Sequence, residues 1–192
     1  MFAPPTPRFA QGRDAAFQAI TAAIGADAGH VTRTPIRAGV SADGAHGFTF
    51  GYVEVAQADG ADWLGKYVAY WVRRPEGWRV SLFKLLPRPP GDVDRSVMTP
   101  SAPLEYAPRR PSDNALFTQS LAAREQQFSD EAHAVGLSQA FARFGRADAV
   151  NVGGEAAFVV GAEAIAATQP DGTSSIIWSA DEGVLVAESG DL

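Results

Sequence analysis

The fold is decided by residues 47–86, which read GFTFGYVEVAQADGADWLGKYVAYWVRRPEGWRVSLFKLL. Aromatic residues alternate with smaller ones at the start, so Phe48, Phe50 and Tyr52 share one face of a strand. Glycine-containing turns then divide the stretch twice. It therefore predicts a three-stranded antiparallel meander with strands at 47–57, 64–73 and 78–86.

The flanking sequence adds helices and further strands. After residue 112 the apolar period becomes helical, because Leu116, Leu121, Phe128 and Val135 fall on one stripe at mostly three- and four-residue steps. Glycines then interrupt the pattern and separate shorter elements. The expected elements outside the meander are a helix at 12–24, a strand at 31–41, a helix from 112 to Gly136, a helix at 137–144, a strand near 149–160, a short helix from about 161 and a strand near 175–188.

A proline-rich linker separates the two parts of the chain. Seven of the 13 prolines fall between Pro87 and Pro111. Proline lacks a backbone N–H and restricts the residue before it, so this stretch suits neither a helix nor an inner strand. We expect a semi-rigid extended connection that lies against a surface through residues such as Val97, Leu104 and Tyr106. The predicted organisation is 1–86, linker 87–111, and 112–192.

The two parts are incomplete copies of one pattern. A strand leads to a glycine, an acidic residue and a short helix at Gly12-Arg13-Asp14 and again at Gly161-Ala162-Glu163. Residues 38–46 likewise resemble 183–192. The first copy lacks the two helices of 112–144, and the second lacks the meander. The truncations are therefore complementary.

Four passages together resemble the nuclear-transport-factor-2-like superfamily, in particular its SnoaL-like and ketosteroid-isomerase-like bacterial members. They are Ala147–Val150, the two glycine-led helix starts, Ser189–Leu192, and Gly65–Trp71 followed by Pro75–Trp78. The resemblance implies an α+β fold in which a cone-shaped antiparallel sheet wraps around helices (a cystatin-like roll), here duplicated in part. It also implies an apolar pocket and dimerisation through the sheet. It implies no activity, because this fold hosts isomerases, cyclases, dehydratases, carriers and assembly domains.

Two explanations of the truncations stay open. In one, the halves complement each other within one chain or between two chains, and the helices of 112–144 shelter the aromatic side of the meander, including Phe50, Trp71 and Trp78. An exposed aromatic sheet face would otherwise leave a large apolar patch. In the other, Met1 aligns with Asn151 and is an internal residue of a longer parent protein. The absence of a signal peptide before Arg8 would then say nothing about localisation, and a periplasmic location stays open.

The candidate chemistry rests on one carboxylate and four aromatics. Enzymes on this fold often place an aspartate at the first strand, and Asp148 holds that position here. Desolvation in an apolar pocket would raise its pKa and make it a general base; a solvated turn is the alternative. Aromatic side chains favour an apolar ligand site, with core packing as the alternative. The candidate ligand-binding residues are Phe50, Tyr67, Trp71 and Trp78.

Composition excludes several classes of function. A net charge of −6 without a basic cluster argues against nucleic-acid binding. No cysteine is present, and His30, His46 and His133 lack metal-ligand spacing, so neither a metal nor another cofactor is expected. No stretch is long and apolar enough for a membrane helix.

Three functions remain as hypotheses. The first is binding of a small apolar ligand in a cone pocket without catalysis, by a protein that forms homodimers. The second is an isomerase, dehydratase or cyclase that uses Asp148 as its base. The third is an oligomerisation module.

Overall fold

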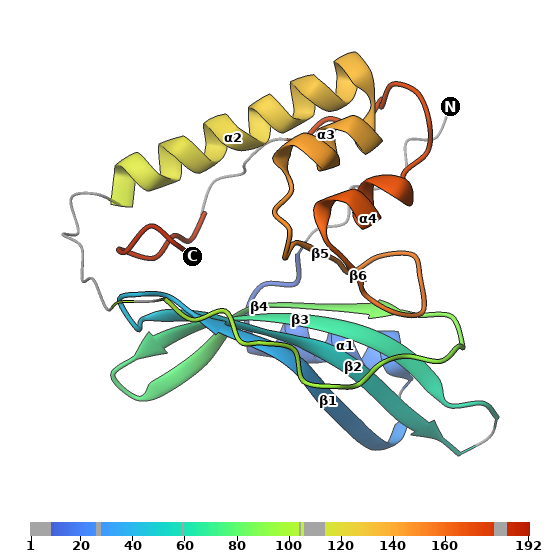
Figure 1. Cartoon of the computed structure of the whole chain (residues 1–192). Helices are drawn as coiled ribbons and strands as arrows, with labels where there is room; N and C mark the ends of the chain where they lie inside the picture. Colours follow the sequence, from blue (N-terminus) through green and yellow to red (C-terminus); the bar gives the residue numbers. More distant parts are fainter. Residues whose placement is uncertain (1–8, 26–27, 59, 104, 106–113, 179–183) are drawn as a thin grey trace.

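The structure of this protein is a computed structural model, which describes residues 9–25, 28–58, 60–103, 105, 114–178 and 184–192. It has an α+β fold in which a layer of helices lies over one face of a four-stranded antiparallel sheet (Figure 1). The strands of the sheet are β1 (Ala28–Val40), β2 (His46–Gln57), β3 (Trp63–Arg74) and β4 (Gly77–Pro87). A small pair is formed by β5 (Val150–Asn151) and β6 (Val159–Val160). The helices are α1 (Arg13–Ile24), α2 (Asn114–Val135), α3 (Leu137–Phe144) and α4 (Ala162–Ala167).

The predicted meander is confirmed and gains a fourth strand. The sheet order is β1-β2-β3-β4, so each strand pairs with its neighbour in sequence. Phe50 pairs with Val68, and Thr49 pairs with Ala69, which sends alternate residues to opposite faces. The register of β1 shifts at Pro35–Arg37, where β1 carries a bulge opposite β2.

Each face of the sheet carries its own hydrophobic cluster. On the face that we call the inner face, Phe50, Tyr52 and Ile36 pack with residues of the linker and of the later half. On the opposite, outer face, Tyr67 and Val55 are almost completely buried, and Ile24 at the end of α1 packs against this cluster. The alternation read from the sequence therefore produces two apolar faces.

The described part of the linker from 88 to 103 is extended and lies on the inner face, as predicted, although through different residues. Val93 and Met98 pack against the inner cluster, and the Met98 N–H donates to Ile36 O at 2.7 Å. Val97, by contrast, is 78% exposed. Leu104 and Tyr106 lie outside the described residues.

The later half contains the predicted helices but shorter strands. The predicted strand near 149–160 is two two-residue strands, because the intervening loop contains Gly153-Gly154, which is a poor strand sequence. The predicted strand near 175–188 is absent from its described parts, 175–178 and 184–188. The backbone there finds other partners: the Trp178 N–H, for example, donates to Ser129 Oγ at 3.2 Å. Residues 179–183 lie outside the described residues.

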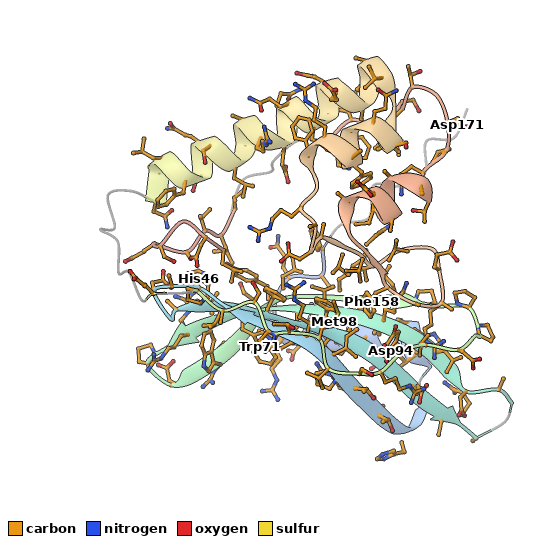
Figure 2. The ribbon with its side chains drawn as sticks, in the orientation of Figure 1. His46, Trp71, Asp94, Met98, Phe158 and Asp171 are labelled. Atoms are coloured by element: carbon orange, nitrogen blue, oxygen red, sulfur yellow. The ribbon has the colours of Figure 1, made fainter. Side chains whose placement is uncertain are left out.

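The later half does cover Phe50, but not by the predicted helices. Phe158 lies in the loop between β5 and β6 and is labelled in Figure 2. Its ring packs on Phe50 and Tyr52 at centroid distances of 5.0 and 5.1 Å. Trp71 belongs to the outer face, where α2 and α3 do not reach. The expectation that the helices shelter Phe50, Trp71 and Trp78 together is therefore wrong, since alternation divides these residues between two faces.

The repeated segments meet each other in space. The Ala42 N–H donates to the Asp191 carboxylate at 3.0 Å, and the Ser189 N–H donates to Asp43 Oδ2 at 3.3 Å. Each aspartate also accepts a hydrogen bond from the serine two residues before it, Ser41 or Ser189. The two Ser-x-Asp turns thus bond to each other in both directions, which ties residues 189–191 to the β1–β2 turn.

Candidate functional site

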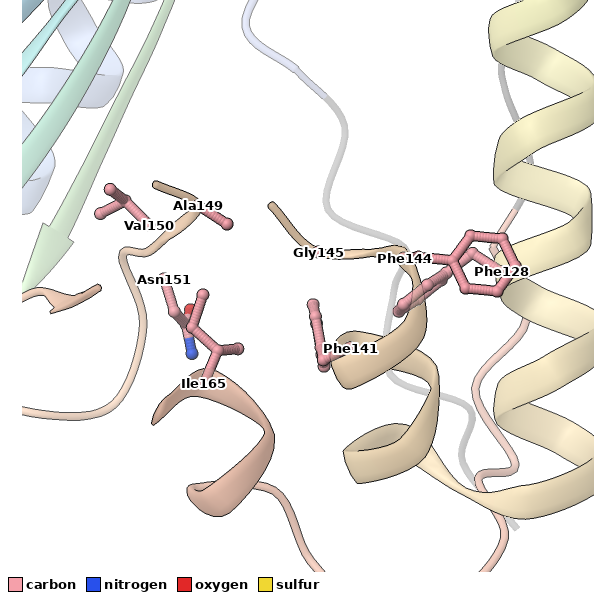
Figure 3. A pocket seen from close by; sticks show the side chains of 8 residues that line it. All are labelled: Phe128, Phe141, Phe144, Gly145, Ala149, Val150, Asn151 and Ile165. Atoms are coloured by element: carbon pink, nitrogen blue, oxygen red, sulfur yellow. The ribbon is translucent and has the colours of Figure 1, made fainter. Parts of the chain in front are cut away.

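The candidate site is an apolar cavity of about 250 Å³ in the later half of the chain, shown from close by in Figure 3. An engineered apolar cavity of about 150 Å³ holds benzene, so this one has room for a substituted ring. Its walls come from α2, α3, α4 and β5. The lining residues are Phe128, Phe141, Phe144, Gly145, Ala149, Val150, Asn151 and Ile165.

Phe128 is the centre of the aromatic wall. Its ring centroid lies 5.0 Å from that of Phe141 and 5.8 Å from that of Phe144, with interplanar angles of 62° and 84°. Trp178 makes a third edge-on contact at 5.2 Å. Such edge-to-face pairs are favourable because the positive edge of one ring meets the negative face of the next.

The opposite wall is held by the start of α4. Gly161 has a φ of 96°, which a residue with a side chain rarely adopts. From this conformation the Gly161 N–H donates to Ala149 O at 2.8 Å, and the Ala162 N–H donates to Arg146 O at 3.1 Å. These bonds bring Ile165, only 3% exposed, opposite the phenylalanines. Gly161 therefore positions the start of α4, and with it Ile165, at the cavity.

Asn151 is the polar side chain of the lining. Its Oδ1 accepts a hydrogen bond from the Gly153 N–H at 3.1 Å, and this contact fixes which end of the carboxamide is the oxygen. No hydrogen bond joins its Nδ2 to another residue within the described part of the chain. The two N–H donors of Nδ2 thus remain for an acceptor on a bound molecule.

Asp148, the predicted general base, adjoins the cavity wall in sequence but does not line it. Its Oδ2 accepts from Arg37 Nη2 at 2.9 Å and its Oδ1 accepts from Arg146 Nε at 2.9 Å. These hydrogen bonds, first from Arg146 and then from Arg37, lower the pKa of Asp148 to about 2. A base needs a pKa near the working pH, so this geometry describes an anchor between the sheet and the later half instead.

The four predicted ligand-binding aromatics lie away from the cavity and on two faces of the sheet. Phe50 is covered by Phe158 on the inner face. Tyr67 is buried on the outer face, with the Arg33 guanidinium 4.6 Å from its ring centroid. Trp71 shares that face and donates to Thr49 Oγ1 at 3.0 Å, whereas Trp78 is 40% exposed. The structure does not bring these four residues together.

The histidines are equally separate. His30 and His133 are exposed, and His46 Nδ1 lies 2.9 Å from Tyr70 Oη at the start of β2. Burial above all, with the negative charges of Asp43 and Asp191, raises the pKa of Tyr70 to about 12. Within the described residues, no group of three His, Cys, Asp or Glu side chains is arranged to hold a metal ion.

The residues of the cavity are only partly recognisable in the sequence. Phe128, Phe141 and Phe144 all belong to the apolar stripes of the predicted helices, where they read as ordinary core residues. Asn151 had no pattern around it. Only the meeting of the helices with β5 turns these residues into the walls of one space.

Comparison of the chain with protein-family models, with curated proteins and with solved structures finds no match. Among the described helices, none combines the length and the apolar character that crossing a bilayer would require.

Proposed function

We propose that this protein binds a small, mainly apolar molecule that carries one hydrogen-bond acceptor. The observation that carries the proposal is the cavity of about 250 Å³, whose apolar walls surround a single carboxamide. Small-molecule sites commonly combine an apolar lining with a few polar groups that fix orientation. Asn151 supplies this group, because its oxygen is engaged by Gly153 while its N–H donors are not.

We also propose that the chain is a member of the nuclear-transport-factor-2-like superfamily, built from two partial copies that complete one cone-shaped unit. The order of elements supports this proposal: two helices, a short strand pair and a small helix in the later half lie over the sheet of the earlier half. The contacts between Phe158 and the inner face, and between the two Ser-x-Asp turns, support intrachain complementation.

The ligand preference can be measured with two molecules that differ in one group. Acetophenone and α-methylstyrene have nearly the same shape, but only the ketone accepts a hydrogen bond. Asn151 is half-buried, and a bound molecule that covers its N–H donors without accepting from them would incur a cost of about 1–3 kcal/mol. We therefore expect acetophenone to bind about tenfold more tightly than α-methylstyrene, as measured by calorimetric or NMR titration of the full chain.

Asn151→Asp is expected to abolish this preference. The carboxylate keeps an acceptor for the Gly153 N–H, so the local turn stays in place, but it has no N–H to offer the ketone. The ratio of the two dissociation constants is the readout, since a general weakening of the site cancels in it. Asn114→Asp, the same change at the chain's other asparagine, is expected to leave the ratio unchanged. Equal affinities of the wild-type protein for both molecules would overturn the proposal.

We also propose a homodimer formed through the outer face, supported by an apolar row that is exposed at both of its ends. Val40, Gly47, Trp71 and Val80 pair in register across all four strands. Val40 and Val80 are 38% and 47% exposed, and Trp78 beside them is 40% exposed. An apolar surface that crosses a whole sheet suits contact with the same surface of a second copy, because a two-fold axis makes a patch complementary to itself.

Trp78→Arg is expected to convert the dimer into a monomer, because it places a charge at the centre of the paired apolar rows. Light scattering after gel filtration measures the mass. Leu82→Arg is the matched control: Leu82 is on the same strand and 41% exposed, but it pairs with Tyr70 and belongs to the inner face. A wild-type monomer at all concentrations, or equal effects of both variants, would contradict this proposal.

A further inference from the structure

The inner face of the sheet carries a buried lysine that the cavity itself does not explain. Lys66, near the start of β3, is 1% exposed. No carboxylate lies within ion-pair distance of it in the part of the chain that the structure describes. Its burial, the largest cause, lowers its pKa. The negative charge of Glu155 offsets part of this effect. A buried cation without a close ion-pair partner still opposes folding, so the hydrogen bonds of Lys66 must compensate for its burial.

Those bonds all go to the loop between β5 and β6. Lys66 Nζ donates to Glu155 O at 2.6 Å and to Ala157 O at 3.1 Å. It also lies 5.3 Å from the ring centroid of Phe158, whose ring is packed between Phe50 and Tyr52. One side chain of the sheet thus binds two carbonyl groups of the loop that are two residues apart.

A series of hydrogen bonds connects the β5–β6 loop to the cavity. Glu155, whose carbonyl accepts from Lys66, donates its own N–H to Gly153 O at 3.0 Å. Gly153 in turn donates its N–H to Asn151 Oδ1 at 3.1 Å. The orientation of the Asn151 carboxamide is therefore linked to Lys66 by three consecutive bonds.

The other end of the same segment is also held by the sheet. Arg37 on β1 donates to Asp148 O at 3.0 Å and to Asp148 Oδ2 at 2.9 Å. The cavity-lining residues 149–151 lie between the two attachments, and Val150 contacts the inner cluster as well as the cavity. All the lining residues belong to the later half of the chain. The segment that carries Asn151 is nevertheless held in position by Arg37 and Lys66 of the sheet.

We propose that Lys66 is a positioning residue of the ligand site: it holds the β5–β6 loop so that the Asn151 carboxamide presents its N–H donors to the acceptor of the bound molecule. This inference rests on the proposed function for its ligand, but the orientation of Asn151 can be measured without any ligand. Lys66 makes no contact with the bound molecule itself.

Lys66→Met removes the donors and keeps a long unbranched side chain. The substitution leaves two carbonyl groups without their donor but removes the cost of burying an ammonium group, so we expect a folded protein. The preference for acetophenone over α-methylstyrene should fall from about tenfold to below threefold. Lys84→Met is the matched control, since Lys84 is the only other lysine, is exposed, and lies on the neighbouring strand. It should retain the full preference.

The second readout uses the chain's two asparagines, 114 and 151. With ¹⁵N-asparagine labelling, Lys66→Met should shift the side-chain amide signals of Asn151 in the free protein and leave those of Asn114 unchanged. Asn114 is a reference because its Nδ2 donates to Val186 O at 3.1 Å, away from the loop. A change in global folding would move both sets of signals.

Chemical rescue completes the test. The chain has no cysteine, so Lys66→Cys can be alkylated with 2-bromoethylamine in the unfolded state and refolded, which restores a lysine-like ammonium at this position alone. We expect the rescued protein to regain the ketone preference and the Asn151 signals. Retention of both properties by Lys66→Met would overturn the inference. A wild-type protein without ketone preference would instead overturn the proposed function, while the amide signals would still decide the role of Lys66.

Discussion

Gly51→Ala is expected to lower the free energy of unfolding by about 3 kcal/mol, at the upper end of the usual cost of overpacking. A Cβ at this position would collide with Thr34 O and would lie 2.8 Å from Pro35 Cα. Both are backbone atoms of β1, so no side chain can rotate away. Relief requires β1 to move away from β2, which weakens the ladder beside the bulge at Pro35–Arg37. Urea denaturation followed by circular dichroism measures the change.

The matched control for this substitution is Gly153→Ala. The only atom within reach of a Cβ there is Asn151 Oδ1 at 3.8 Å, an ordinary contact, and the N–H that Gly153 donates is retained. We expect a change within about 0.5 kcal/mol. If Gly51→Ala proved equally mild, the close approach of β1 to β2 at the bulge would be wrong.

Phe128→Ala is expected to lower the free energy of unfolding by about 3 kcal/mol, the lower end of the range for aromatic truncation because the side chain is half-buried. It removes three edge-on ring contacts at once, with Phe141, Phe144 and Trp178. Thermal or urea unfolding measures the loss. Since the substitution also enlarges the cavity, both test molecules should bind more weakly with their ratio retained.

Leu121→Ala provides the comparison on the same helix. Leu121 lies two turns before Phe128 and is 41% exposed, so its truncation should cost about 1 kcal/mol or less. Equal losses for the two variants would show that Phe128 is not the centre of the helical core, and the description of the cavity wall would fail with it.

The contrast between Phe128 and Asp148 shows which parts of the site the sequence predicts. Phe128 belongs to a helical stripe, and the helix forms where the stripe predicts it. The sequence places Asp148 at the start of a strand. The pKa of its carboxyl group, however, depends in part on Arg37, which is 111 residues away in the chain. The expected rise in its pKa required an apolar pocket, whereas two guanidinium groups lower it to about 2. Partners so distant in sequence leave no local pattern.

The same distinction applies to the sheet. Alternation in 47–57 correctly sent Phe48, Phe50 and Tyr52 to one face, because successive side chains of any strand point to opposite sides. In the structure, Gly47 pairs with Trp71 and Phe50 pairs with Val68. Trp71 and Phe50 therefore lie on different faces of the sheet. The alternation within one strand does not give the pairing between strands. For this reason the sequence groups aromatic residues of both faces into one predicted ligand site.

The sequence by itself determined the helices, the meander and the extended linker, because periodicity, glycine and proline act over a few neighbouring residues. Tertiary structure alone decided that Phe158 covers Phe50, that Lys66 binds the carbonyls of a loop some 90 residues later, and that three helical phenylalanines meet Asn151 around an empty volume. Hydrogen bonds and ring contacts between distant segments depend on how the layers are placed on each other. That placement minimises exposed apolar area and unpaired polar groups over the whole chain at once.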